Sequence, residues 1–359
     1  MSTATVNGER TATAHDMSAN KAAVQSPEMS AGPVFVVGMW RSGTSLLYAL
    51  LNQHPQIGLM YESDLALLSP LFLLPRKSSW WLKKVDSWNG VLTRHKIDPS
   101  LIAENIGDLP GAFSAVARQY ARNNGATIWG CKSPSYYDCM TDLADWFPQA
   151  KFIVIWRDPA EVLRSIVRAA EKSPWFARQG MDLRALLGYR RMKQEADELA
   201  RRGAAIHQLQ YDDLVRDPAM SITAICDFIG IRFDSRMASL EGADRSALYN
   251  GDHHSGVKSS SIVAKRDRPE VLSSALKSKI ERYVAFWRKE SGGSWPIVAT
   301  AKECARPASW LERTVDRVRH RALRSLDLIV PFAYAFVPIA AWQSYRQVKS
   351  RYQRVAAKP

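Results

Sequence analysis

The sequence predicts an α/β protein in three layers, with a central, mostly parallel sheet flanked by helices and a helical extension at the C-terminus. An unbroken apolar run at 34–37 is followed by a glycine-containing turn and by leucines at helical spacing. A second run, 151–156, precedes a proline suited to the first turn of a helix. A third predicted strand, 206–210, leads into another strand-to-helix turn. Repeated strand–turn–helix units are typical of a parallel sheet covered by helices.

The first of these units, residues 34–51, is predicted to bind an anion. Its apolar run reads as a strand buried on both faces, and the turn that follows contains Gly38, Arg41 and Gly43. In such a turn the backbone N–H groups and the positive end of the helix dipole point at one spot. We therefore expect a phosphate-binding loop at the end of the first strand.

This loop differs from the P-loop of nucleotide-triphosphate enzymes. Gly38, Gly43 and Ser45 fall in register with G-x-x-x-x-G-K-[ST], but Thr44 stands at the lysine position and the cation is Arg41. A triphosphate enzyme needs that lysine together with magnesium. The loop therefore favours a less charged phosphate-bearing group bound without a metal. The dinucleotide fingerprint G-x-G-x-x-G is absent from it, which argues against NAD or FAD.

The stretch VFVVGMWRSGTSLLYALLNQHPQI (34–57) resembles the 5′-phosphosulfate loop of the PAPS-dependent sulfotransferases. Its RSGT is closest to the bacterial, Golgi and tyrosylprotein-type branch. The resemblance implies a P-loop NTPase-like sulfotransferase fold, PAPS as sulfuryl donor and no metal. It also implies that Arg41, Ser42, Gly43, Thr44 and Ser45 bind the donor. An ordinary glycine-rich turn between a strand and a helix is the alternative for this motif alone.

A second motif strengthens the resemblance. The run 151–156 ends in Arg157-Asp158-Pro159, and Ser165 lies eight residues after Arg157. This resembles the family motif R-(D/N)-P-x₅-S, which grips the 3′-phosphate of PAPS. By this resemblance Arg157 supplies a forked cation and Ser165 a hydroxyl.

The expected catalytic base is Glu62, which follows a predicted strand at 56–60. In the families that the chain resembles, an acidic residue here is the proposed general base. The alternative is that Glu62 or Asp64 caps the next helix. His253 and His254 are further candidates for the base, but adjacent histidines in a polar loop are more often solvated, and Glu62 is preferred.

Lys132 ends another predicted strand, 127–131, and begins the sequence Lys132-Ser133-Pro134. It resembles the family's K-(S/T)-P element, whose lysine lies near the bridging oxygen and the transferring sulfuryl group. Lys132 would then offset the charge that grows on the leaving phosphate. A surface lysine beside a turn proline is the alternative.

Other motifs carry weaker signals. Tyr211 follows the predicted strand 206–210, where it would either contact the nucleotide or have a purely structural role. In the serine-rich loop 253–268, Lys265 is expected to pair with a donor phosphate, by resemblance to the loop that folds over the nucleotide in tyrosylprotein-type enzymes. Helices are predicted over 110–124 and 270–290.

Composition limits the class and the cellular location. The chain has 359 residues, a net charge of +14 and a pI of about 9.7, which favours anionic partners. Its four cysteines show no metal-binding spacing and read as reduced. Residues 1–32 contain no apolar run, so we expect this segment to be disordered and to hold neither a signal peptide nor an anchor. We expect a single domain over 33–295 and a basic, partly apolar helical tail over 296–359. A bacterial cytoplasmic protein fits these features best.

The acceptor is the least defined part of the prediction. Residues 65–90 are apolar, then basic and tryptophan-rich. This composition suits contact with an apolar acceptor, a bilayer interface or nucleic acid. A helical hairpin that only packs on the core is the alternative. The apolar run 326–342 spans ~25 Å as a helix, short of a ~30 Å hydrocarbon core. An interfacial segment is preferred there; a buried terminal helix or an oligomer contact is the alternative.

The sequence thus predicts sulfuryl transfer from PAPS to a hydroxyl or amine of a carbohydrate, glycolipid or lipid-like acceptor. The expected location is cytoplasmic, peripheral at the inner face of the membrane, without nucleic acid as a partner. A P-loop kinase and a membrane-associated nucleotide- or lipid-binding protein are the rival functions. The sequence leaves the oligomeric state open.

Overall fold

The computed structural model describes residues 28–63, 108–171 and 180–246, some positions within 92–101, 173–177 and 274–281, and residues 248, 262 and 344. The segments 65–90 and 326–342, the pair His253 and His254, Asp64 and Lys265 lie outside the described residues. Within the predicted helix 270–290, every described position is helical.

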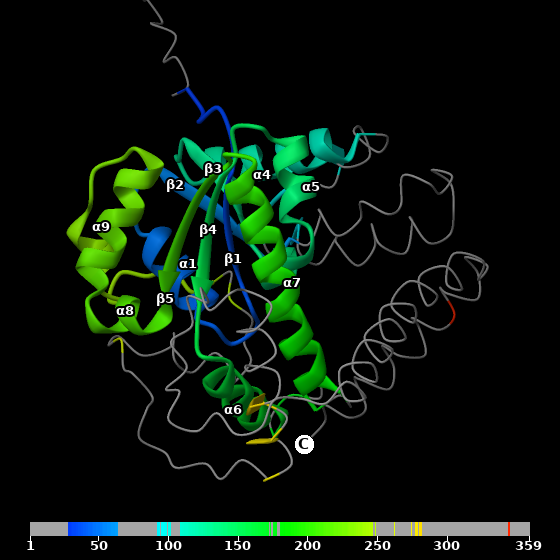
Figure 1. Ribbon diagram of the computed structural model, residues 1–359. Helices are drawn as coiled ribbons and strands as arrows, with labels where there is room; N and C mark the ends of the chain where they lie inside the picture. The colour runs from blue at the N-terminus through cyan, green and yellow to red at the C-terminus, as the bar shows by residue number, and fades with distance from the viewer. Residues whose placement is uncertain are drawn as a thin grey trace, which may run out of the picture.

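A five-stranded sheet forms the centre of the fold (Figure 1). Its strands are β1 (Val34–Gly38), β2 (Ile57–Tyr61), β3 (Ile128–Lys132), β4 (Lys151–Trp156) and β5 (Ala205–Gln210). They run parallel in the order β2-β3-β1-β4-β5. Every residue of β1, β2 and β3 is buried, as expected for strands that are covered on both faces. The predicted parallel sheet is confirmed.

Helices cover both faces of this sheet (Figure 1). On one face lie α4 (Leu109–Asn123), α5 (Met140–Trp146) and α7 (Met181–Arg201), and on the other lie α1 (Thr44–Leu51), α8 (Tyr211–Arg216) and α9 (Pro218–Ile229). The remaining elements are α6 (Pro159–Ala170) and the short helices η2 (Pro134–Asp138) and η3 (Ser235–Ala238). The predicted three-layer arrangement is therefore confirmed, and the bounds of the five strands and of α4 differ from the predicted ones by at most one residue.

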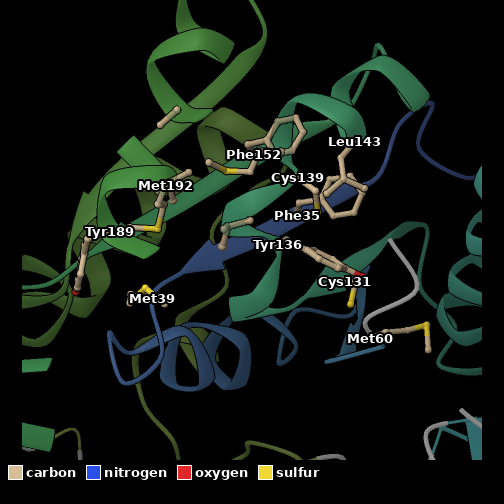
Figure 2. Packing of buried hydrophobic residues seen from close by; sticks show 14 of the residues in the cluster. Phe35, Met39, Met60, Cys131, Tyr136, Cys139, Leu143, Phe152, Tyr189 and Met192 are labelled. Carbon is tan, nitrogen blue, oxygen red and sulfur yellow. The ribbon is translucent and has the colours of Figure 1, made fainter. Parts of the chain in front are cut away.

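Alternation along the strands gives each face its own apolar core. On the face of α4 and α7, Phe35 of β1 stacks on Phe152 of β4 with ring centroids 5.4 Å apart. Tyr136 packs against the Phe35 ring in a T-shaped contact, with ring centroids 5.8 Å apart (Figure 2). The neighbouring residue Val36 points to the opposite face, where it packs with leucines of α1.

The order of the strands creates a switch point at the carboxyl ends of β1 and β4, where successive strands are added on opposite sides of β1. From β1 the chain continues to β2 and β3 on one side, and then to β4 and β5 on the other. In open α/β sheets, ligands bind at the carboxyl ends of the strands where the order reverses. The turns after β1 and β4 therefore lie beside each other at the position that such folds use for ligands.

The start of α6 fixes the second of these turns. Asp158 is the N-cap, and its carboxylate accepts hydrogen bonds from the N–H groups of Ala160 and Glu161. Pro159 occupies the first turn, where the absence of an N–H costs nothing. Burial raises the pKa of Asp158, and the two backbone N–H groups oppose this shift. The cap holds Arg157 between the end of β4 and the start of the helix.

None of the helices in the described ranges is long and apolar enough to cross a bilayer.

Gly130 should be indispensable for the sheet, because the backbone of Val34 in the neighbouring strand β1 lies directly against it. Its φ is 153°, and a Cβ here would lie 1.9 Å from the carbonyl oxygen of Val34. We expect Gly130→Ala to lower the free energy of unfolding by about 3 kcal/mol or more, measured by denaturant unfolding. Gly203→Ala is the control: it has φ 71° with open space around it and should cost about 1–2 kcal/mol. Equal losses in the two variants would contradict this role of Gly130.

Candidate active site

The turn between β1 and α1 has the geometry of an anion-binding loop. Arg41 and Gly43 both adopt left-handed backbone conformations, with φ of 68° and 103°. Gly43 is the N-cap of α1 and no side chain caps the helix. The first N–H groups of a helix have no acceptor within it, and they carry the positive end of its dipole. The start of α1 thus offers donors for an anion.

A buried hydroxyl inside this loop also fits such a ligand. Ser42 is fully buried, and its Oγ has no hydrogen-bond partner among the residues that the structure describes. A Cβ at Gly38 would lie 2.6 Å from this oxygen, so the glycine leaves room for it. Buried polar atoms almost always have a partner. An acceptor-rich group such as a phosphate would provide one, and the residues present therefore fit a phosphate-bearing donor.

The turns after β1 and β4 meet through two arginines and a serine. Arg157 donates from Nη1 to the backbone carbonyl of Arg41 over 3.0 Å. Arg41 donates from Nε to the hydroxyl of Ser165 on α6, also over 3.0 Å. The sequence assigned Arg41 to one phosphate of the donor and Arg157 and Ser165 to the other. In the structure the three residues form one connected cluster.

This cluster is electrostatically crowded. Burial lowers the pKa of Arg41 to about 10, and the nearby charge of Arg157 adds to the shift. The carboxylate of Glu161 lies 3.9 Å from Nη2 of Arg157, beyond hydrogen-bond distance. Two guanidinium groups held this close repel each other. A negatively charged ligand between them would relieve that repulsion.

Tyr211 joins the two turns from the side. Its ring lies 4.2 Å from the guanidinium carbon of Arg157, in a cation–π contact. The same ring lies against Gly43, where a Cβ would come within 2.4 Å of it. Residue 43 must therefore be glycine both for its backbone conformation and for its contact with Tyr211.

A buried ion pair lies at the ends of the neighbouring strands β2 and β3. Lys132 is fully buried, and its Nζ donates to Oε1 of Glu62 over 2.5 Å and to Oγ of Ser45 over 3.2 Å. The Nζ also lies 4.2 Å from the ring centroid of Tyr61. Tyr61 and Lys132 are partners in the parallel register, so both side chains point to the face that carries α1. The alternative that Lys132 is a surface lysine is therefore wrong.

An unusual backbone turn brings Glu62 to this lysine. Its N–H donates to the carbonyl of Lys132 over 2.7 Å, and its φ is 49°. In a continuing strand Glu62 would point to the face opposite Tyr61. The left-handed turn returns its carboxylate to the side of Lys132. Such conformations cost non-glycine residues about 1–3 kcal/mol and cluster at functional sites.

Lys132 keeps its charge in this environment. Burial of the ammonium lowers its pKa, but the charge of Glu62 and the hydrogen bonds to Glu62 and Tyr61 outweigh burial, and the pKa is raised overall. The site therefore holds a charged ammonium beneath a partly exposed carboxylate.

The structure brings most of the predicted site residues together. Near the carboxyl ends of β1 to β4 lie the predicted donor-binding residues Arg41, Ser42, Gly43, Thr44, Ser45, Arg157 and Ser165, and the predicted catalytic residues Glu62 and Lys132. Sequence reasoning missed Tyr61, because its contact with Ser45 depends on the strand register. Among the described residues, no group of three or more His, Cys, Asp or Glu side chains could hold a metal.

A parallel sheet with an uncapped glycine loop and basic groups at its switch point is the arrangement expected of a P-loop-like α/β protein. A protein-family model described as "Sulfotransferase family" matches residues 33–235, more than half of the chain. The chain therefore belongs to the sulfotransferase family.

Several solved structures are similar to the chain. The sulfotransferase domain of the Synechococcus PCC 7002 olefin synthase is 24% identical with a TM-score of 0.49, and the match covers 73% of this chain and 97% of that one. The sulfotransferase domain of the curacin biosynthetic pathway is 19% identical with a TM-score of 0.47, covering 75% and 100%. A mouse sulfotransferase complexed with PAP is 14% identical with a TM-score of 0.41, covering 72% and 85%. No curated protein matches the chain.

The coupling of Lys132 to Glu62 should appear in the alkaline stability of the protein. A raised pKa stabilises the fold below the ordinary lysine pKa of 10.5, and this contribution is lost as the pH rises through the raised value. In Glu62→Gln the raising charge is gone, so we expect a smaller loss of unfolding free energy as the pH rises above the ordinary lysine pKa of 10.5. Urea unfolding across this range measures it.

The matched control is Glu198→Gln, which removes a carboxylate that pairs with Arg201 and Arg202 on the surface. Arginines keep their charge over this range, so this variant should lose stability as the wild type does. An unchanged alkaline slope in Glu62→Gln would show that the two groups are not coupled in solution.

Proposed function

We propose that this member of the sulfotransferase family transfers the sulfuryl group of PAPS to a hydroxyl or amine of an acceptor, releasing PAP. The observation that carries the proposal is the contact of Lys132 with both Glu62 and Ser45. It connects a carboxylate that can accept a proton with the first turn of α1, the helix that follows the phosphate loop. PAPS, when bound, supplies the sulfuryl group and the phosphate leaving group.

The loop after β1 would hold the 5′-phosphosulfate of the donor. The N–H groups of Arg41 and of Gly43 to Ser45 and the buried hydroxyl of Ser42 are donors, which suits a group that offers only acceptors; the N–H of Ser42 itself donates to the carbonyl of Met39. Arg157 and Ser165 would hold the 3′-phosphate, and the Arg41 side chain, bonded to Ser165, lies within their cluster. Binding at these two places fixes the donor across the switch point.

Glu62 and Lys132 divide the chemistry between them. The side chain of Glu62 is 20% exposed and that of Lys132 is 0% exposed, so an acceptor can reach the carboxylate while the ammonium stays beneath it. Glu62 takes the proton of the acceptor hydroxyl or amine as that group attacks in line. Lys132 offsets the negative charge that develops on the departing phosphate.

The rival functions fit these residues less well. A magnesium-dependent P-loop kinase needs a lysine at the position of Thr44. A protein that only binds nucleotide or lipid would not need a carboxylate in a strained backbone turn beside a buried ammonium. Sulfuryl transfer accounts for both groups.

For the acceptor we propose a carbohydrate, glycolipid or lipid-like molecule, bound by a domain over 33–295 of the bacterial, Golgi and tyrosylprotein-type branch. The sequence RSGT supports the branch. The acceptor class and a peripheral location at the inner membrane face are supported by the apolar, basic and aromatic composition of 65–90 and 326–342. Lys265 is proposed as a further donor contact from its loop sequence.

An assay with labelled PAPS on a panel of lipids and glycans tests this function. The wild type should label at least one acceptor, and Glu62→Ala should lower turnover by about 10²–10⁴-fold because the acceptor proton loses its base. Glu198→Ala, which removes a surface carboxylate, is the control and should keep full turnover. Normal turnover of Glu62→Ala would refute its role as base. Magnesium-dependent use of ATP instead of PAPS would refute the function.

Binding of PAP to the Arg157→Ala variant tests the second phosphate contact. A hydrogen bond to a charged group is worth about 1.5–3 kcal/mol, so the Kd should rise by about 10- to 150-fold in calorimetry. Arg216→Ala, which removes an exposed arginine of α8, should bind PAP as the wild type does. Unchanged affinity in Arg157→Ala would remove this residue from the donor site.

A further inference from the structure

The hydroxyl of Tyr61 lies in the site without a role in the mechanism above. Its oxygen is 2.8 Å from Oγ of Ser45, in the first turn of α1. The Tyr61 side chain is fully buried at the end of β2, and its ring also packs edge-on against Tyr48, with centroids 5.0 Å apart. Tyr61, Ser45 and Lys132 therefore form a small polar cluster between the sheet and the phosphate loop.

The hydrogen-bond chemistry of Ser45 decides what this contact does. A serine hydroxyl has one hydrogen to donate and two lone pairs that accept. The Lys132 ammonium can only donate, and it donates to Ser45. If the Ser45 hydrogen points to Tyr61, Ser45 cannot donate it to a ligand. If Tyr61 donates instead, both lone pairs of Ser45 are occupied and its hydrogen is directed outward.

An anion in the loop selects the second arrangement. Phosphate and sulfate oxygens only accept hydrogen bonds, so Ser45 can contact them only as a donor. We propose that Tyr61 is a positioning residue that donates to Ser45 and thereby directs the Ser45 hydrogen to the phosphosulfate group of the donor. This inference rests on the proposed function, since it takes PAPS as the ligand of the loop.

Two properties suit Tyr61 to this task. Burial raises the pKa of its phenol above the usual value, although the charge of Lys132 opposes the shift, so the phenol keeps its proton at neutral pH. The face of its ring lies against the ammonium of Lys132, and this cation–π contact holds the ring in place. The ring thus contacts Lys132, and the hydroxyl contacts both Lys132 and Ser45. A hydroxyl that accepts from the Lys132 ammonium still has its own hydrogen to donate to Ser45.

The variant Tyr61→Phe removes the hydroxyl and keeps the ring. We expect the Kd of PAP to rise and kcat/KM for PAPS to fall, each by about three- to tenfold, the effect of one neutral hydrogen bond. The KM of the acceptor should not change, because the acceptor does not contact Ser45. Tyr48→Phe, which removes another buried tyrosine hydroxyl of the same core, should bind PAP as the wild type does.

A double-mutant cycle shows whether Tyr61 acts through Ser45. In a Ser45→Ala background, Tyr61→Phe should have no further effect on the Kd of PAP. Equal effects in both backgrounds, or PAP affinity of Tyr61→Phe equal to that of the wild type, would overturn the inference. In either case the proposed function stands as long as the wild type binds PAP; failure of the wild type to bind PAP would refute the function itself.

A ring-fluorinated tyrosine at position 61 tests the direction of the bond even if Tyr61→Phe does not fold. Its phenol loses its proton at a lower pH, and the phenolate can only accept. The Ser45 hydrogen would then turn toward the phenolate. We expect PAP affinity to fall as the pH rises through this ionisation, relative to the wild type at the same pH. Affinity equal to that of the wild type at every pH would contradict the proposed donor role.

Discussion

The central position of β1 is the constraint on which the site depends. It pairs with β3 on one side and with β4 on the other, in parallel register on both. The phosphate loop therefore leaves the sheet between the strand that ends in Lys132 and the strand that precedes Arg157. Both groups reach the loop without long connections, because neighbouring parallel strands end at the same edge. Gly130 permits this arrangement because it has no Cβ that would collide with the backbone of Val34 in the neighbouring strand β1.

The sequence predicts most of the fold because strands buried on both faces appear as continuous apolar runs, and glycine marks the turn that follows. It also predicts which residues gather at the carboxyl ends of the strands, since most of them follow such a run. It does not predict their contacts. The register of β2 against β3 places Tyr61 beside Lys132, and the left-handed turn at Glu62 aims its carboxylate, yet neither depends on local sequence. The contact of Arg41 with Ser165 likewise joins residues 124 positions apart.

The distribution of charge separates the site from the surface. On the surface, carboxylates lie beside their cationic partners, and hydrogen bonds from Arg201 and Arg202 lower the pKa of Glu198 to about 2. At the switch point the opposite holds: burial and the charge of Arg157 lower the pKa of Arg41 to about 10. Uncompensated positive charge is unfavourable in the folded protein. Its concentration at one strand edge is explained if a polyanion completes the site.

The pair of Glu62 and Lys132 supports the same conclusion by a different route. A buried ion pair is a poor way to stabilise a fold, because desolvation of the charges offsets much of their attraction. Here the pair carries this desolvation cost, and one of its two members, Glu62, also has a strained backbone. Stability alone would favour an apolar pair at this position. Both unfavourable features are accounted for if the carboxylate must face an acceptor while the ammonium stays beside the phosphate loop, which is the geometry that sulfuryl transfer requires.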